Sequence, residues 1–264
     1  MNALILIALN TFKDAIRQKV IFLMAFVAFA LTLSSNYLLK FNLGQEQLAF
    51  IADFTTGALG FFGSVIAIVS VCQLFYSEFD NRTAMTLLSK PLGSFEFVAG
   101  KLLGAAMLLA VFVFAVSVLG YAMMAYTQYR LRELPPDILV GRHLELSASG
   151  FAAYAFLQFL KLLTVASLAT FVCMVSRSLM FAIIVSFMAC AVSLVLGSDF
   201  AEGGGIVEQV ATFFFPNLRV FAASEAFIFE GANAAQLFAA AGYSLIYSFT
   251  LCALGVWAFS TRET

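Results

Sequence analysis

Long, uninterrupted apolar stretches constrain this chain more than any other feature of its sequence. There are six, each about twenty residues long, and they cover Val20–Leu39, Thr56–Tyr76, Leu102–Tyr126, Phe151–Val175, Leu179–Leu196 and Leu237–Phe259. About 20 residues at about 1.5 Å each make an α-helix that crosses the hydrocarbon core of a bilayer. Because lipid offers the backbone no hydrogen-bonding partners, such stretches adopt helices. The sequence therefore predicts one all-α transmembrane domain, residues 1–264, with six spans.

The composition excludes several other classes of protein. Hydrophobic residues make up 62% of the chain and charged residues 11%, whereas soluble domains contain about 45–50% apolar residues. A net charge of -1 leaves no broad basic surface, so we expect membrane lipid and not nucleic acid as a partner. The four cysteines lie in apolar stretches without a C-x-x-C pair, and there is one histidine. We expect buried, packing cysteines and no metal site.

The basic residues predict the orientation of the chain. Six spans place both termini on the same side of the membrane. Eight basic residues fall on that side, and they are Lys13, Arg17, Lys19, Arg82, Lys90, Lys101, Arg177 and Arg262. Five fall on the other, and they are Lys40, Arg130, Arg132, Arg142 and Arg219. Since basic residues collect on the cytoplasmic side, we expect cytoplasmic termini.

A short amphipathic helix is predicted ahead of the first span, at about residues 3–19. Apolar residues recur there at helical spacing, from Ile5 through Leu9 to Ile16, while Lys13, Arg17 and Lys19 supply positive charge. Such a helix lies in the membrane interface. Two interpretations are equally open, a plain membrane anchor and an elbow that braces the protein at its cytoplasmic surface.

The outer stretch Gly197–Gln236 is too apolar for an ordinary loop. Its segment Ile206–Ala223 is rich in phenylalanine and other apolar residues around Pro216 and Asn217. Because the proline interrupts a helix, this segment is not a span. We expect a pair of short helices that re-enter the outer leaflet.

The cytoplasmic stretch Ser77–Gly104 is polar yet patterned. Thr83–Ser89 is predicted to form a short helix that ends at Pro91. Gly100 and Gly104 form a pair of small residues suited to close helix packing at the start of the third span. The short helix carries an apolar ridge suited to a groove on a partner protein. The alternative is an interfacial turn on lipid headgroups.

A family resemblance favours the partner interpretation. The pattern Ser77-Glu78-x-Asp80-x-Arg82-Thr83-x3-Leu87-Leu88-Ser89-Lys90-Pro91, followed by Phe97-x2-Gly100-Lys101-x2-Gly104, resembles the cytoplasmic loop of type-2 ABC transporter permeases. The resemblance extends to an elbow helix, six spans and outer re-entrant helices. It implies a permease dimer, with identical or different subunits, that acts as an exporter in a bacterial inner membrane.

The resemblance also assigns site residues and a partner. The residues implied to couple the permease to its ATPase are Glu78, Asp80, Arg82, Thr83, Thr86, Leu87, Leu88, Ser89, Lys90 and Pro91. The sequence contains no G-x4-G-K-[ST] motif, so the chain is not expected to be an enzyme. ATP and magnesium would be bound by a separate cytoplasmic subunit. The alternative function is a scaffold or sensor subunit that uses an ATPase without moving a solute.

One lysine lies within the predicted spans. Lys161 is about ten residues, or about 15 Å, into the fourth span. A lysine near the bilayer centre costs about 2.5–3.5 kcal/mol and marks a candidate functional site. Gln158, Lys161 and Thr164, with Pro216 and Asn217 outside, form a candidate translocation path. The alternative is that Lys161 snorkels outward. No acidic residue occurs in any predicted span.

Overall fold

The computed structural model describes residues 3–38, 47–80, 94–132, 145–195 and 215–260. In these ranges every regular element is helical. The elements are α1 (Ala3–Ile16), α2 (Lys19–Leu38), α3 (Gln47–Asp80), α5 (Ser94–Arg132), α6 (Ala148–Val175), α7 (Leu179–Val195), the 3-10 helix η4 (Leu218–Ala226), α9 (Phe227–Glu230) and α10 (Ala234–Ser260).

Four of these helices, α3, α5, α6 and α10, are long and apolar enough to cross a membrane. The pair α1 and α2 meets at a bend of 68° and makes a fifth span if the two count as one. The apolar helix α7 is shorter than the others. The chain is therefore an all-α integral membrane protein, as predicted. By length and composition, four to five of the described helices suit a membrane span, and the predicted number of six is not confirmed.

The long helices extend well beyond the apolar stretches that predicted them. Helix α3 begins at Gln47, whereas the predicted span begins at Thr56, and α5 begins at Ser94, ahead of the predicted Leu102. A search for apolar residues detects only the part of a helix within hydrocarbon, while the backbone hydrogen-bond ladder continues into the headgroup region. The connection between the second and third predicted spans is consequently shorter than the sequence suggested.

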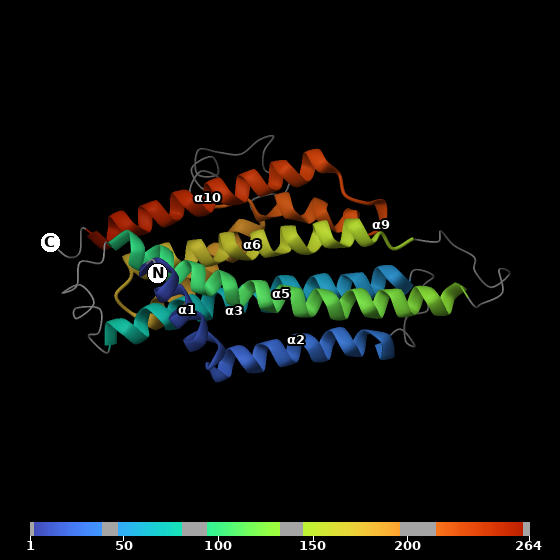
Figure 1. Ribbon diagram of the computed structural model, residues 1–264, viewed down its shortest axis with the longest axis horizontal. Helices are drawn as coiled ribbons and strands as arrows, with labels where there is room; N and C mark the ends of the chain where they lie inside the picture. The colour runs from blue at the N-terminus through green and yellow to red at the C-terminus, as the bar shows by residue number, and fades with distance from the viewer. Residues whose placement is uncertain (1–2, 39–46, 81–93, 133–144, 196–214, 261–264) are drawn as a thin grey trace.

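The helices α2, α3, α5, α6 and α10 run along the long axis of the molecule (Figure 1). Helix α6 is central, since it packs against α3, α5, α7, α10 and η4. The C-terminal end of α3, the start of α5, helix α1 and the end of α10 share one end of the bundle. That end carries the candidate site.

Small residues allow the central helices to approach closely. A Cβ atom at Gly63 of α3 would lie 2.6 Å from Leu162 Cδ1 of α6, so a larger residue there would force the Leu162 side chain to shift. Small residues also line the buried face of α7, namely Ala182, Ser186, Cys190 and Ser193. Because apolar side chains gain little from leaving lipid, close packing of this kind holds membrane helices together. All four cysteines are buried and free, as predicted.

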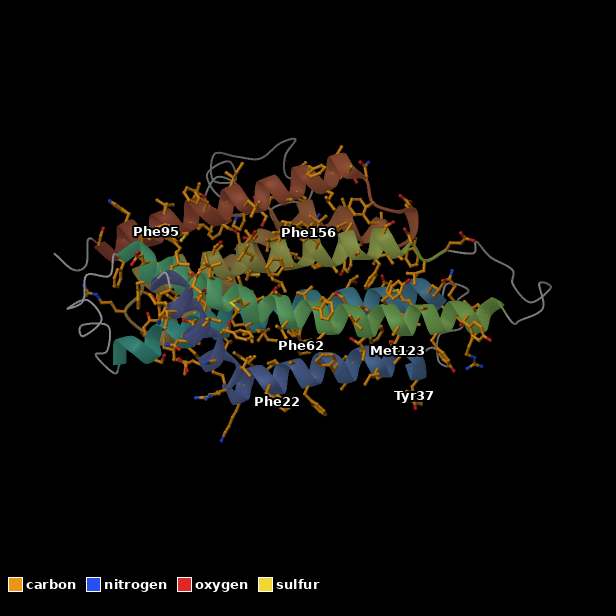
Figure 2. The ribbon with its side chains drawn as sticks, viewed as in Figure 1. Phe22, Tyr37, Phe62, Phe95, Met123 and Phe156 are labelled. Atoms are coloured by element: carbon orange, nitrogen blue, oxygen red, sulfur yellow. The ribbon has the colours of Figure 1, made fainter. Side chains whose placement is uncertain are left out.

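Large apolar side chains cover the outside of the bundle. Phe22 and Tyr37 lie on the side of α2 that faces away from the other helices (Figure 2), and both are more than 70% exposed. In a soluble protein such a surface would drive association. Here it faces the acyl chains.

Candidate functional site

The structure describes the base of the predicted coupling loop. Glu78 and Asp80 belong to the last turn of α3. The other coupling residues, which are Arg82, Thr83, Thr86, Leu87, Leu88, Ser89, Lys90 and Pro91, lie outside the described residues, as does the predicted helix Thr83–Ser89. The two helices that enter and leave this segment, α3 and α5, are described, and their facing ends carry an unusual interaction.

Lys101, in the third turn of α5, is buried at the end of α3. Its side chain is only 1% exposed. The Nζ atom donates a hydrogen bond to the carbonyl oxygen of Leu74. It also lies 4.8 Å from the ring centroid of Phe75 and 4.9 Å from that of Phe97. A buried cation is favoured by a carbonyl oxygen that accepts its hydrogen bond and by aromatic faces. Lys101 therefore ties the end of α3 to the start of α5.

Aromatic contacts extend this connection to α10. The rings of Phe75 and Phe97 meet edge to face with centroids 6.1 Å apart, and Phe97 stacks on Phe259 at 5.7 Å. The hydroxyl groups of Tyr76 and Ser176 are 2.8 Å apart, which joins α3 to the junction of α6 and α7. We name the cluster of Lys101, Phe75, Phe97, Phe259 and Tyr76 the inner clamp, where the inner end means the end of the bundle at which α3 and α10 end. It fixes the helix ends that flank residues 81–93.

Helix α1 packs directly on the start of α5. A Cβ atom at Gly104 would lie 2.5 Å from Thr11 Cβ, and one at Gly100 would lie 2.9 Å from Ile7 Cγ2. The predicted close packing of Gly100 and Gly104 is thus confirmed, and α1 is their partner. The small buried residues Ala8 and Thr11 supply the matching face.

The outer surface of α1 agrees with a position in the membrane interface. Ile5 and Ile16 are exposed beside the polar residues Lys13 and Arg17, which are also exposed. Helix α1 ends at Ile16, earlier than the predicted residue 19, so Arg17 follows it and Lys19 is the first residue of α2. Because α1 packs against α5, it contacts the helix that leaves the candidate coupling loop.

A second group of polar residues lies farther along the bundle, around Lys161. This lysine is half-buried midway along α6, and its Nζ lies 3.9 Å from the position that a Cβ at Gly60 of α3 would occupy. Tyr154 and Gln158 precede it on α6 and are buried. The Tyr154 hydroxyl and the Gln158 side chain interact with each other, one turn apart on α6.

The structure separates Thr164 from Lys161. The Oγ1 atom of Thr164 lies 2.8 Å from Oγ of Ser244, and both hydroxyls donate to the carbonyl oxygen of Leu160. Thr164 is therefore part of the contact between α6 and α10, whereas Lys161 lies beside α3.

The segment around Pro216 is anchored to two helices. Asn217 caps η4, since its Oδ1 accepts a hydrogen bond from the backbone N–H of Arg219, and its own N–H donates to the Tyr243 hydroxyl of α10 at 2.6 Å. Nε of Arg219 donates to the carbonyl oxygen of Leu194 in α7. Pro216 is buried and Asn217 exposed. These contacts place η4 beside the long helices, between α7 and α10.

Glu225 of η4 is a charged neighbour that the sequence did not reveal. Its carboxylate interacts electrostatically with Lys161 and Tyr154. Glu225 is exposed at the surface of the chain, yet the surrounding protein atoms raise the pKa of its carboxyl group by removing water from it. The positive charge of Lys161 lowers this pKa, and the negative charge of Asp53 raises it further. The 64 positions that separate Lys161 from Glu225 carry no pattern linking them, so only the fold brings them together.

Comparison with known proteins adds no identification. No protein-family model and no curated protein matches the chain. Among the residues that the structure describes, no group of three or more histidine, cysteine or acidic side chains is placed to hold a metal ion. The arrangement consists of a fixed base beneath residues 81–93 and a polar cluster midway along α6.

Proposed function

We propose that the chain is the membrane-spanning permease subunit of an ATP-binding-cassette transporter, an exporter driven by a separate ATPase that docks on residues 77–101. The inner clamp is the observation that carries this proposal. It joins α3, α5 and α10 at the base of the docking loop through Lys101, Phe97 and Phe259. A force applied to residues 81–93 would therefore reach three long helices at once.

The remaining elements fit the same proposal. Helix α1 would be the elbow, and α2 and α7 would complete six spans with α3, α5, α6 and α10. The helices η4 and α9 would be the re-entrant pair on the outer side. Two copies of the permease, both with cytoplasmic termini, would bind two ATPases in the inner membrane. Closure of the ATPases on ATP would push the loops and shift the bundle between two states.

The experiment that tests this proposal uses the docking loop. The double variant Thr86→Glu, Leu88→Glu introduces two charges on the predicted docking helix. We expect the protein to insert normally but to lose the ATPase activity that co-purifies with the unaltered chain in mild detergent. The matched control is Ala232→Glu, Gln236→Glu, which adds the same charges to exposed positions at the other end of the bundle.

The outcomes separate the function classes. Loss of ATPase co-purification in the loop variant but not in the control supports the proposal. Equal ATPase activity in both would contradict docking on this loop. ATP-driven flux of a solute in reconstituted vesicles supports a transporter, whereas ATPase association without any flux supports a scaffold or sensor subunit.

A further inference from the structure

Helix α1 carries an apolar face that the described helices leave uncovered. Its buried face, which includes Ala8 and Thr11, packs on α5. Ile5, Leu9 and Ile16 recur at helical spacing on another face, and each is 38–51% exposed. We name these three residues the apolar face of α1. On a helix in the membrane interface, such a face lies among the acyl chains.

The bend between α1 and α2 places α1 close to the membrane plane. Helix α2 is apolar and 20 residues long, which is the length of a membrane span, and it begins at Lys19, directly after the bend. Helix α1 leaves it at 68°. With α2 as a span, a helix joined to its end at so steep an angle runs along the membrane surface. The bend and α1 therefore lie at the level of the lipid headgroups.

Two cations, Lys13 and Arg17, lie along one edge of the apolar face. Four residues advance about 40° beyond a full turn of helix, so Lys13 follows Leu9 around the helix by about 40°, and Arg17 follows Lys13 by a similar angle. Both side chains are exposed, and neither forms an ion pair with a described residue. We name these two residues the cationic edge of α1.

The acidic residue of α1 lies away from the apolar face. At 3.6 residues per turn, Asp14 is about 140° around the helix from Leu9, beyond the cationic edge. It is exposed. The order around the exposed side of α1 is therefore apolar, cationic and then polar, which matches the order of acyl chains, phosphate groups and water across a membrane surface.

The charge of the cationic edge favours one class of lipid. A basic residue near a membrane surface gains about fivefold in affinity for anionic lipid. Phosphatidylcholine offers the same phosphate group but carries its own positive charge beside it, so it balances a protein cation less well. The two basic side chains lie one helical turn apart and can act on the same headgroup or on two neighbouring ones.

We propose that the exposed side of α1 is a docking surface for anionic phospholipid. The apolar face lies among the acyl chains, and the cationic edge binds the headgroups in preference to zwitterionic ones. This inference does not rest on the proposed transport function, because it involves neither an ATPase nor a cargo. It assigns a lipid partner to α1.

The test reads the lipid composition beside α1 by fluorescence. The chain has one tryptophan, Trp257 of α10. Trp257→Phe removes it, and Leu9→Trp places a single fluorophore in the apolar face. The purified chain is placed in nanodiscs of equal parts phosphatidylglycerol and phosphatidylcholine, with one of the two lipids brominated in its acyl chains. Because bromine quenches tryptophan on contact, the ratio of quenching by the two lipids measures the preference of the surface.

We expect phosphatidylglycerol to be preferred at least about threefold at Leu9→Trp. The preference should shrink at about 1 M salt, where charges are screened within about 3 Å. A second reporter, Phe238→Trp with Trp257→Phe, lies in the exposed first turns of α10 at the other end of the bundle, and we expect no preference there.

Variants on the reporter chain identify the cationic edge. Lys13→Gln with Arg17→Gln should reduce the preference to about one, because both charges are lost. The matched control Lys13→Arg with Arg17→Lys keeps both charges and should keep the preference. Arg130→Gln removes an exposed cation near the end of α5 and should change nothing. Quenching by brominated phosphatidylcholine should persist in every variant, which shows that α1 still lies in lipid.

Each outcome decides the proposal. A preference that disappears in the neutral variant and survives in the charge-conserving one supports it. Equal quenching by the two lipids in the unaltered reporter chain would overturn it, as would a preference that the neutral variant retains. Quenching by neither lipid would mean that protein covers the apolar face, and would also overturn it. The loop experiment is unaffected by any of these results, because it does not involve α1.

Discussion

A single buried cation, Lys101, connects the ends of α3 and α5. The variant Lys101→Met keeps much of the apolar volume but removes the hydrogen bond to Leu74 and the contacts with Phe75 and Phe97. We expect the chain to insert and the free energy of unfolding to fall by about 1–3 kcal/mol. We also expect the co-purifying ATPase to continue to hydrolyse ATP without driving transport. Thermal unfolding in nanodiscs and flux measurements in vesicles check both effects.

The matched control for this change is Lys19→Met. Lys19 is the first residue of α2, and its side chain is exposed. Substitutions of exposed side chains usually change stability by less than about 0.5 kcal/mol. If Lys19→Met lowered the unfolding midpoint as much as Lys101→Met, the inner clamp would have no special role.

At the scale of residues, local patterns predicted burial but not electrostatic partners. The cysteines were predicted to be buried because they lie in apolar stretches, and they are. Lys101 was predicted only as an ordinary cation at the inner surface, whereas it is buried under two aromatic rings. Aromatic residues lie throughout the sequence, so the position of these two rings follows from helix packing. The approach of Glu225 to Lys161 depends on that packing too.

At the scale of helices, the contact between α1 and α5 makes a sharp prediction. A methyl group at Gly104 would collide with Thr11 and with the carbonyl oxygen of Ala8, 2.8 Å away. We expect Gly104→Ala to displace α1 and to lower the free energy of unfolding by about 1–3 kcal/mol. Thermal unfolding in nanodiscs measures the loss.

Gly57 in α3 provides the control for this prediction. Among the described residues, no atom outside the adjoining helix backbone lies within 4 Å of the position that a Cβ would take there. Since alanine favours helix by about 1 kcal/mol over glycine, Gly57→Ala should leave stability unchanged or raise it slightly. Similar destabilisation in both variants would argue against close packing of α1 on α5.

The sequence predicted that each helix exists more readily than it predicted where the helix begins and ends or which helix it packs against. Each predicted span corresponds to a helix, because a run of about 20 apolar residues leaves the backbone little alternative. The pair Gly100 and Gly104 predicted a close contact without naming its partner, since any helix with small residues could fill that role. Helix α1 was predicted from its own amphipathic pattern, so the contact joins two features that the sequence presented separately.

For the whole molecule, the inner clamp implies that the bundle moves more at its outer end. Contacts join α3 to α5, α5 to α10, and α3 to the α6–α7 junction, all at the inner end. Spin labels at Arg17 and Leu103 report on that end, and labels at Tyr129 and Phe238 report on the other; all four residues are exposed. The buried native cysteines would first be replaced by alanine or serine.

Electron–electron distance measurements on these two label pairs test the implied motion. When the co-purified ATPase binds ATP, we expect the inner pair to stay within about 2 Å of its starting distance and the outer pair to change by about 5 Å, the scale of helix shifts in switching proteins. A large inner change with a fixed outer pair would mean that the bundle pivots at its outer end and that the clamp transmits no motion.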